Sequence, residues 1–194
     1  MAAKRKIFWR IIAALCTAAV LFALCVFGAG FFKKTTHPMK YDSYVEAYSK
    51  EYGVDKSLIY AVIKTESGFD PNAVSSVGAR GLMQITEETF DWLLYREKTV
   101  TGSAPPLIYD DMFDPETNIK YGVMLLAYLE GEYTDPQIFL SAYHAGVGNV
   151  NAWLANPKYS DDGETLNYIP EPTTEYYVKK VTDAEYTYKK LYKL

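Results

Sequence analysis

The stretch from Leu58 to Thr86 reads LIYAVIKTESGFDPNAVSSVGARGLMQIT and decides how this chain can be interpreted. Its apolar residues follow the spacing of one helix face, at Ile59, Val62 and Ile63, and the next position on that stripe is Glu66. Such a stripe normally faces a core, so we expect Glu66 to be partly buried near the end of its helix. Burial and the negative end of the helix dipole both raise the pKa of a carboxyl group, which favours a proton donor. A solvated Glu just past the helix is the alternative that this stretch alone leaves open.

The residues after Glu66 form a longer pattern. It reads Glu-Ser, then Pro-x-Ala-x-Ser-x-x-Gly-Ala-x-Gly-Leu-Met-Gln from Pro71 to Gln84. A second motif, AYHAG, lies at residues 142–146, and the segment FDPETNIKYGVMLLAYL at residues 113–129 stands between the two. Together these motifs resemble the lytic transglycosylase family, which has a goose-lysozyme-like fold. The resemblance covers roughly residues 41–181, and so many fixed positions in order are far more specific than a lone short motif.

The resemblance implies a role for each matched residue. Glu66 would be the catalytic acid and base, and Tyr143 would place its hydroxyl near Glu66 and hold the Glu66 rotamer. Ser75 and Gln84 are similar to residues that hydrogen-bond the sugars, and Met83 would pack beneath an acetamido group. Taken singly, Met83 and Tyr143 are equally compatible with plain core packing.

Two positions depart from the family pattern. His144 stands where the family has Asn; neutral His can also donate and accept a hydrogen bond, and it adds a titration near neutral pH. The fourth family motif resembles YIPEPTTEYYVKKV, in which Tyr177 would line the cleft but the family Glu aligns with Thr173. Glu171 or Glu175 are the acids that could replace it.

The resemblance implies an enzyme that cleaves the bond between N-acetylmuramic acid and N-acetylglucosamine in peptidoglycan and leaves a 1,6-anhydro end. Such chemistry uses a single Glu and needs no metal and no organic cofactor. Three alternatives stay open: a goose-type lysozyme that hydrolyses the same bond, a wall-binding protein without catalysis, and a wall-remodelling accessory of a secretion or conjugation machine.

The start of the chain predicts a membrane anchor. Residues 11–32 carry no charge, and at the helical rise they span about 33 Å, enough to cross a bilayer core. Four basic residues precede them, so the positive-inside rule places residues 1–10 in the cytoplasm and the remainder outside the cell. A cleaved signal peptide and lipidation at Cys25 are the alternatives. We therefore expect a cytoplasmic tail (1–10), a transmembrane anchor (11–32), a linker (33–40) and a catalytic domain (41–194) that faces the cell wall.

Amino-acid composition limits the binding partners expected for the outer part, which is residues 33–194. All 24 acidic residues but only 16 of the 20 basic residues follow the apolar stretch, which gives that part a formal charge of −8. This balance argues against nucleic acid as a partner, and it means that binding of an anionic polymer must come from local groove contacts. Both cysteines, Cys16 and Cys25, precede the outer part, which must therefore fold without disulfides.

Capping signals predict a mostly α domain, and the family resemblance implies that its fold is lysozyme-like. Two stretches without periodicity, residues 99–111 and 156–172, are expected to be long loops, either of which could hold a small hairpin. The expected helices are 43–52, a helix capped by Asp55 that ends near Glu66, a short one from Thr86 through Leu94, one from Asp114-Pro115 to about Leu129, one from Asp135-Pro136 that carries Tyr143, 147–154, and 174–192.

Overall fold

The computed structural model describes residues 9, 17, 20–22, 34–103 and 105–194. The chain divides into two units, residues 1–38 and 39–194. The expected membrane anchor at residues 11–32 lies almost entirely outside the described residues. Among the helices that are described, none combines the length and the apolar composition that spanning a bilayer requires.

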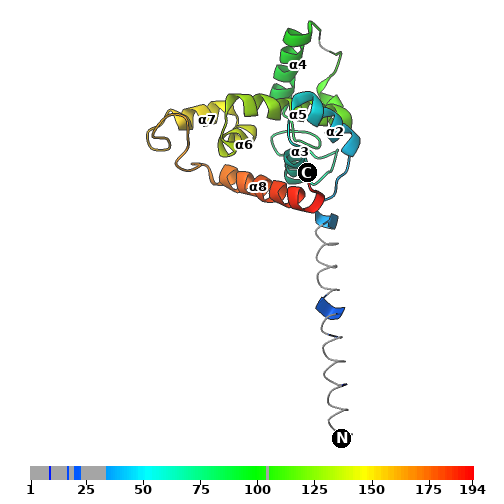
Figure 1. Ribbon diagram of the computed structural model, residues 1–194. Helices are drawn as coiled ribbons and strands as arrows, with labels where there is room; N and C mark the ends of the chain where they lie inside the picture. Colours follow the sequence, from blue (N-terminus) through cyan, green and yellow to red (C-terminus); the bar gives the residue numbers. More distant parts are fainter. Residues whose placement is uncertain (1–8, 10–16, 18–19, 23–33, 104) are drawn as a thin grey trace. The chain divides into compact units, whose positions relative to one another are not determined.

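The second unit is helical, which confirms the expected mostly α fold class (Figure 1). Extended pairing among its described residues is limited to two isolated antiparallel bridges, Val74–Arg80 and Arg80–Ile85, so neither long loop holds a hairpin. In chain order the elements are α2 (Asp42–Tyr52), α3 (Lys56–Glu66), α4 (Glu87–Thr101), the 3-10 helix η1 (Tyr109–Phe113), α5 (Pro115–Glu132), α6 (Pro136–Ala145), α7 (Val147–Leu154) and α8 (Pro172–Tyr192).

Helix α3 lies in the middle of this unit (Figure 1), and its residues 57–63 are all buried. A helix that is apolar nearly all round is covered on every side by neighbours. The most extensive of these contacts is with α8, where the ring of Tyr60 stacks on that of Tyr188 at a centroid distance of 5.3 Å. Helix α5 packs against α2 and α6, and α6 also packs against α7 and α8. The end of α3, which carries Glu66, is thereby fixed inside the domain.

The capping residues set the helix starts as expected. The side chains of Asp55, Asp114 and Asp135 each accept a hydrogen bond from a backbone N–H in the first turn of α3, α5 and α6. Thr86 does the same for α4, and α2 ends at Gly53 in the left-handed conformation that favours glycine. These local signals explain why most predicted boundaries agree with the structure within two or three residues.

The prediction for α4 was wrong at its end. The helix continues to Thr101 and is capped by Gly102, well beyond Leu94. Only Phe90 and Leu93 are buried in it, whereas Tyr95 and Val100 are exposed, so the apolar stripe stops although the helix does not. The expected loop at 99–111 is correspondingly shorter and runs into η1.

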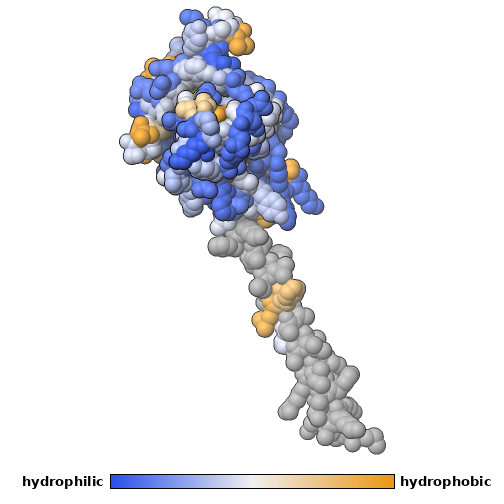
Figure 2. Space-filling model, turned by 90° about the vertical axis from the view of Figure 1, so that its left-hand side faces the viewer, coloured by the Kyte–Doolittle hydropathy of each residue, from blue (hydrophilic) through white to orange (hydrophobic). Residues whose placement is uncertain are grey.

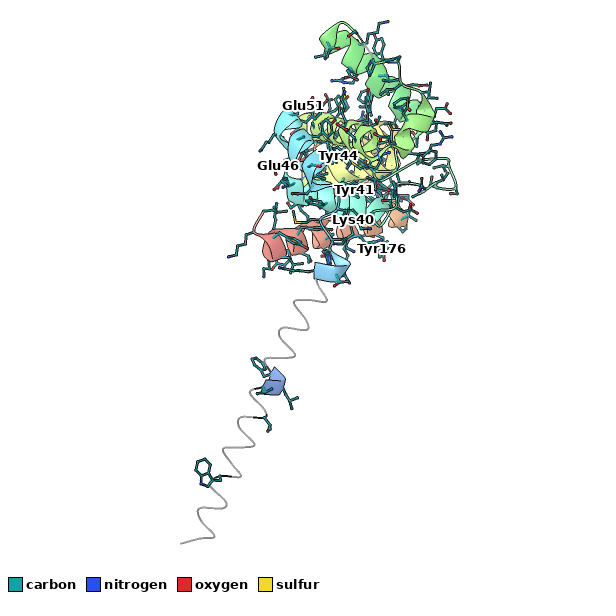
Figure 3. All side chains as sticks on the ribbon, turned by 90° about the vertical axis from the view of Figure 1, so that its right-hand side faces the viewer. Lys40, Tyr41, Tyr44, Glu46, Glu51 and Tyr176 are labelled. Atoms are coloured by element: carbon teal, nitrogen blue, oxygen red, sulfur yellow. The ribbon has the colours of Figure 1, made fainter. Side chains whose placement is uncertain are left out.

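The described surface of the second unit is mainly hydrophilic on the face seen in Figure 2, with small separate apolar spots. Figure 3 shows Glu46 and Glu51 on α2 and Tyr176 on α8, and Tyr176 is 65% exposed. Glu46 pairs with Lys50 and Lys56 at 2.6 and 2.5 Å. Exposed ion pairs of this kind add little stability, so the fold rests on the buried helix contacts.

Candidate active site

Glu66 is the last residue of α3 and is half-buried. Burial raises the pKa of Glu66 to about 7, while a nearby Tyr177 hydroxyl and the positive charge of Lys180 lower it to a smaller extent. Desolvation therefore dominates, as the apolar stripe predicts. A carboxyl group with this pKa is partly protonated at neutral pH, and it can both donate a proton and take one back.

Glu66 lines one of three adjoining hollows, and this hollow shares lining residues with each of the other two. Its own hollow, of about 210 Å³, shares Thr89, Leu125 and Tyr143 with a second one of about 430 Å³, and shares His144 with a third of about 500 Å³. The hollow of Glu66 therefore adjoins a further hollow at Tyr143 and another at His144, and we call the three together the cleft. Besides Glu66, the middle hollow is lined by Ser75, Val77, Ala79, Gln84, Ile85, Thr86, Thr89, Leu125, Tyr143 and His144.

Ser75 and Gln84 both line the hollow around Glu66. Their side chains also form hydrogen bonds within residues 71–85, which we call the floor segment. The Ser75 hydroxyl oxygen accepts a hydrogen bond from the Ala79 N–H at 3.0 Å. The side-chain amide nitrogen of Gln84 donates to the carbonyls of Ala73 and Gly81 at 3.1 and 2.9 Å. Since that nitrogen is committed to the turn, the amide oxygen of Gln84 is the group available to a sugar.

Met83 differs from the expectation. Its side chain is fully buried, so in this structure it cannot touch an acetamido group. It lies in the core against Gly122, where an added Cβ would come within 2.3 Å of the Met83 sulfur. Gly81 fits against Asn118 and the Met112 carbonyl, each 2.2 Å from an added Cβ. Both glycines serve the packing beneath the cleft.

Tyr143 lies on α6 beside Glu66, whose negative charge, together with burial, raises the pKa of Tyr143 well above its ordinary value. Its hydroxyl donates to the backbone carbonyl of Met83 at 2.8 Å. Tyr143 was expected near Glu66, holding the Glu66 rotamer; since a hydroxyl has one proton to give and this one goes to Met83, Tyr143 cannot hold that rotamer by donating to the carboxylate. The bond instead fixes the floor segment against α6.

Tyr177 is the second tyrosine beside Glu66, and it comes from α8. Its buried hydroxyl lies near enough to the Glu66 carboxyl group to lower the pKa of that group, but it makes no hydrogen bond of normal geometry within the described part of the chain. Burial and the Glu66 charge raise the pKa of Tyr177 well above its ordinary value, so its proton stays in place. The Tyr177 hydroxyl is therefore the group that can donate a hydrogen bond to Glu66 when Glu66 is ionised.

The structure also contains site residues that the sequence patterns did not identify. Asn118 on α5 is buried and donates to the carbonyls of Arg80 and Met112, while its side-chain oxygen accepts from the Met83 N–H at 2.7 Å. Lys180 acts on Glu66 through its charge. Asn118 stands in the quoted middle-helix segment, where a polar residue on the buried side of the helix was a signal that could have been used.

A helical domain that places one carboxyl group of raised pKa in a hollow beside two others can give and take a proton there. The family model described as the transglycosylase SLT domain matches residues 43–166. The chain therefore belongs to this family, whose fold is lysozyme-like.

Named relatives agree with this assignment. The chain is 34% identical over 155 residues to the soluble lytic murein transglycosylase of Escherichia coli K12, covering 78% of this chain and 23% of that protein. It is 34% identical over 171 residues to the membrane-bound lytic murein transglycosylase C of Cronobacter sakazakii, covering 78% of this chain and 47% of that protein. The chain thus spans less than half the length of these two relatives.

A solved structure shows the same fold. The 70 kDa soluble lytic transglycosylase of Escherichia coli superposes with a TM-score of 0.67 at 28% identity, over 81% of this chain and 25% of that one. An inactive mutant of the lytic transglycosylase Slt from Pseudomonas aeruginosa gives a TM-score of 0.66 at 28% identity, over 80% and 25%.

Proposed function

We propose that this protein is a peptidoglycan lytic transglycosylase that cleaves the β-1,4 bond between N-acetylmuramic acid and N-acetylglucosamine. The observation that carries the proposal is Glu66, whose pKa burial raises to about 7 in a hollow that adjoins two others. Among the described residues that line the hollow around it, no second carboxylate is present. Glycosidases that hydrolyse through two carboxylates need that second group close to the scissile bond.

One carboxyl group is sufficient for the proposed reaction. Glu66 gives its proton to the glycosidic oxygen, and the bond from that oxygen to C1 of the muramic acid breaks. The 6-hydroxyl oxygen of the same sugar then bonds to C1 and returns its proton to Glu66. The product carries a 1,6-anhydro ring, no water is consumed, and Glu66 ends in the protonated state in which it began.

Product analysis tests this proposal against a goose-type lysozyme. We expect purified cell walls treated with the protein to release muropeptides with anhydro ends, each one water lighter than the hydrolysis product, as measured by mass spectrometry. A lysozyme-treated sample of the same walls is the control for the hydrated mass. Products with only hydrated muramic ends would contradict the transglycosylase assignment and favour hydrolysis.

The pH dependence of cleavage follows from the raised pKa of Glu66. Because the reaction begins with the protonated acid, we expect kcat/KM to fall as the pH rises through about 7. The Tyr177 hydroxyl lowers the pKa of Glu66, so Tyr177→Phe should move this basic limb to higher pH. The measurement is a rate profile of both proteins on the same walls. Tyr176→Phe, an exposed neighbour, is the control, and a limb that does not move in Tyr177→Phe would contradict the assigned contact.

We also propose that residues 11–32 anchor the protein in the cell membrane, with residues 41–194 facing the wall. The uncharged stretch and the basic cluster before it support this, as does the membrane-bound relative. The intact mass of protein extracted from membranes should match an uncleaved and unmodified chain. A species that begins near Gly30, or one with a lipid on Cys25, would contradict the anchor.

A further inference from the structure

A chain of hydrogen bonds runs from the cleft to the start of α8. The ring nitrogen Nδ1 of His144 lies 3.0 Å from the Thr174 hydroxyl oxygen. That hydroxyl in turn donates to the carboxylate of Glu171, the residue that caps α8. Thr174 is fully buried, whereas Thr173, which also donates its hydroxyl to Glu171, is exposed, and the hydrogen bond of His144 is to Thr174.

The ionisation state of Glu171 determines which atoms of Thr174 and His144 carry the protons of these hydrogen bonds. Hydrogen bonds from Thr173 and Thr174 hold the pKa of Glu171 at about 2, so its carboxylate is ionised and accepts. The single hydroxyl proton of Thr174 is given to Glu171, and the Thr174 oxygen must therefore accept from His144. His144 accordingly carries its proton on Nδ1, and its other nitrogen, Nε2, is an acceptor in the neutral ring.

The neutral ring is the form expected at neutral pH. Burial lowers the pKa of His144, and the Glu171 charge offsets this only in part. The other titratable groups around the ring are Glu66 from α3, which lines the same hollow, and Tyr177 from α8. The ring of Tyr177 stacks on that of His144 at a centroid distance of 4.6 Å and an angle of 29°, which fixes the plane of the imidazole.

The location of His144 indicates which ligand its Nε2 atom would contact. His144 lines both the hollow that contains Glu66 and the adjoining hollow lined by Trp153 and Pro170. We propose that Nε2 of His144 accepts a hydrogen bond from an O–H or N–H of the saccharide bound where these two hollows meet. Thr174 and Glu171 are then positioning residues that hold His144 in the accepting tautomer. This inference rests on the proposed function, because it assigns a contact to the same glycan.

The tautomer can be measured without any activity. The full-length chain has two histidines, so His37→Gln leaves His144 as the one imidazole to observe. In detergent micelles at neutral pH, long-range proton–nitrogen-15 correlation should show a proton on Nδ1 and a pyridine-like Nε2. Thr174→Val keeps the shape of the side chain but removes the hydroxyl, and it should move the proton toward Nε2. Thr173→Val is the matched control and should leave the wild-type pattern. A proton on Nε2 in the starting protein overturns the inference.

The contact with the glycan is tested in two further ways. In Glu66→Gln, addition of a chitin tetrasaccharide should shift the Nε2 resonance of His144, and an unchanged resonance in the saturated complex overturns the contact. In the active protein, Thr174→Val should lower kcat/KM by about 2- to 10-fold, mainly through KM, which is the range of one hydrogen bond. Thr173→Val should match wild type, and equal rates in both variants overturn the positioning role. If the parent protein cleaves no wall, the proposed function fails, while the tautomer and the resonance shift still decide the inference.

Discussion

Replacement of Glu66 by Gln should leave a folded protein that has lost nearly all cleavage. General acid–base catalysis contributes about 10²- to 10⁴-fold to a rate, and here one residue is assigned both proton transfers. Gln has the size of Glu but cannot give or take the proton, so kcat should fall by at least about 10²-fold on purified walls. Far-ultraviolet circular dichroism should match that of the wild-type protein.

The same variant should be more stable than the wild type at neutral pH. The folded state raises the pKa of Glu66 from 4.5 to about 7, so ionisation disfavours the folded state. This disadvantage is absent below about pH 4.5, grows as the pH rises, and is complete above about 7. The gain in the free energy of unfolding of Glu66→Gln should follow that course.

Glu87→Gln, in the exposed first turn of α4, is the matched control. It removes the same charge outside the described lining of the cleft and should keep both activity and stability near wild type. A Glu66→Gln protein that is correctly folded and retains most of its turnover would remove Glu66 from the mechanism.

The second large effect is expected at Asn118. Its replacement by Leu removes hydrogen bonds to the Met83 N–H and to the carbonyls of Arg80 and Met112. The Arg80 carbonyl keeps the hydrogen bond from the Ile85 N–H at 3.1 Å, so two buried groups, the Met83 N–H and the Met112 carbonyl, lose their partner. Each buried polar group without a partner costs about 1–3 kcal/mol, so we expect a loss of about 2 kcal/mol or more in the free energy of unfolding.

Activity should fall together with stability in this variant, because Asn118 holds the floor segment in place. Urea unfolding followed by circular dichroism measures the first effect, and product release from walls measures the second. Asn72→Leu, at an exposed site in the same floor segment, should change neither by much. A stable and active Asn118→Leu protein would mean that the floor does not depend on this residue.

Much of the fold was accessible from the sequence because its signals are local. Caps such as Asp55 and Asp114 act on backbone groups within one turn, so the residues that start a helix are readable directly. The end of α4 was not readable, since residues 98–101 are exposed and carry no apolar stripe that would mark it. The helix is held beyond Leu94 by a polar contact, the pair of Glu97 with Lys120 of α5, and it ends at Gly102.

The candidate site was only partly predictable, for a related reason. The burial of Glu66 follows from the spacing of one helix, and its environment agrees with that expectation. The contacts of Met83, Tyr143 and Thr174 instead depend on packing between segments far apart in the chain. No spacing within a single helix reveals that the Tyr143 hydroxyl reaches Met83, or that His144 reaches Thr174.

The contact between α3 and α8 has a consequence for the timing of activity. Helix α8 is made after every other helix described here, and it supplies both the packing partner of α3 and the Tyr177 ring beside His144. During synthesis the nascent domain therefore contains Glu66 but lacks both the main packing partner of α3 and one wall of its cleft. We expect a ribosome- or translocon-bound intermediate that ends before Pro172 to be unable to cut glycan, so that the proposed activity appears only when α8 docks.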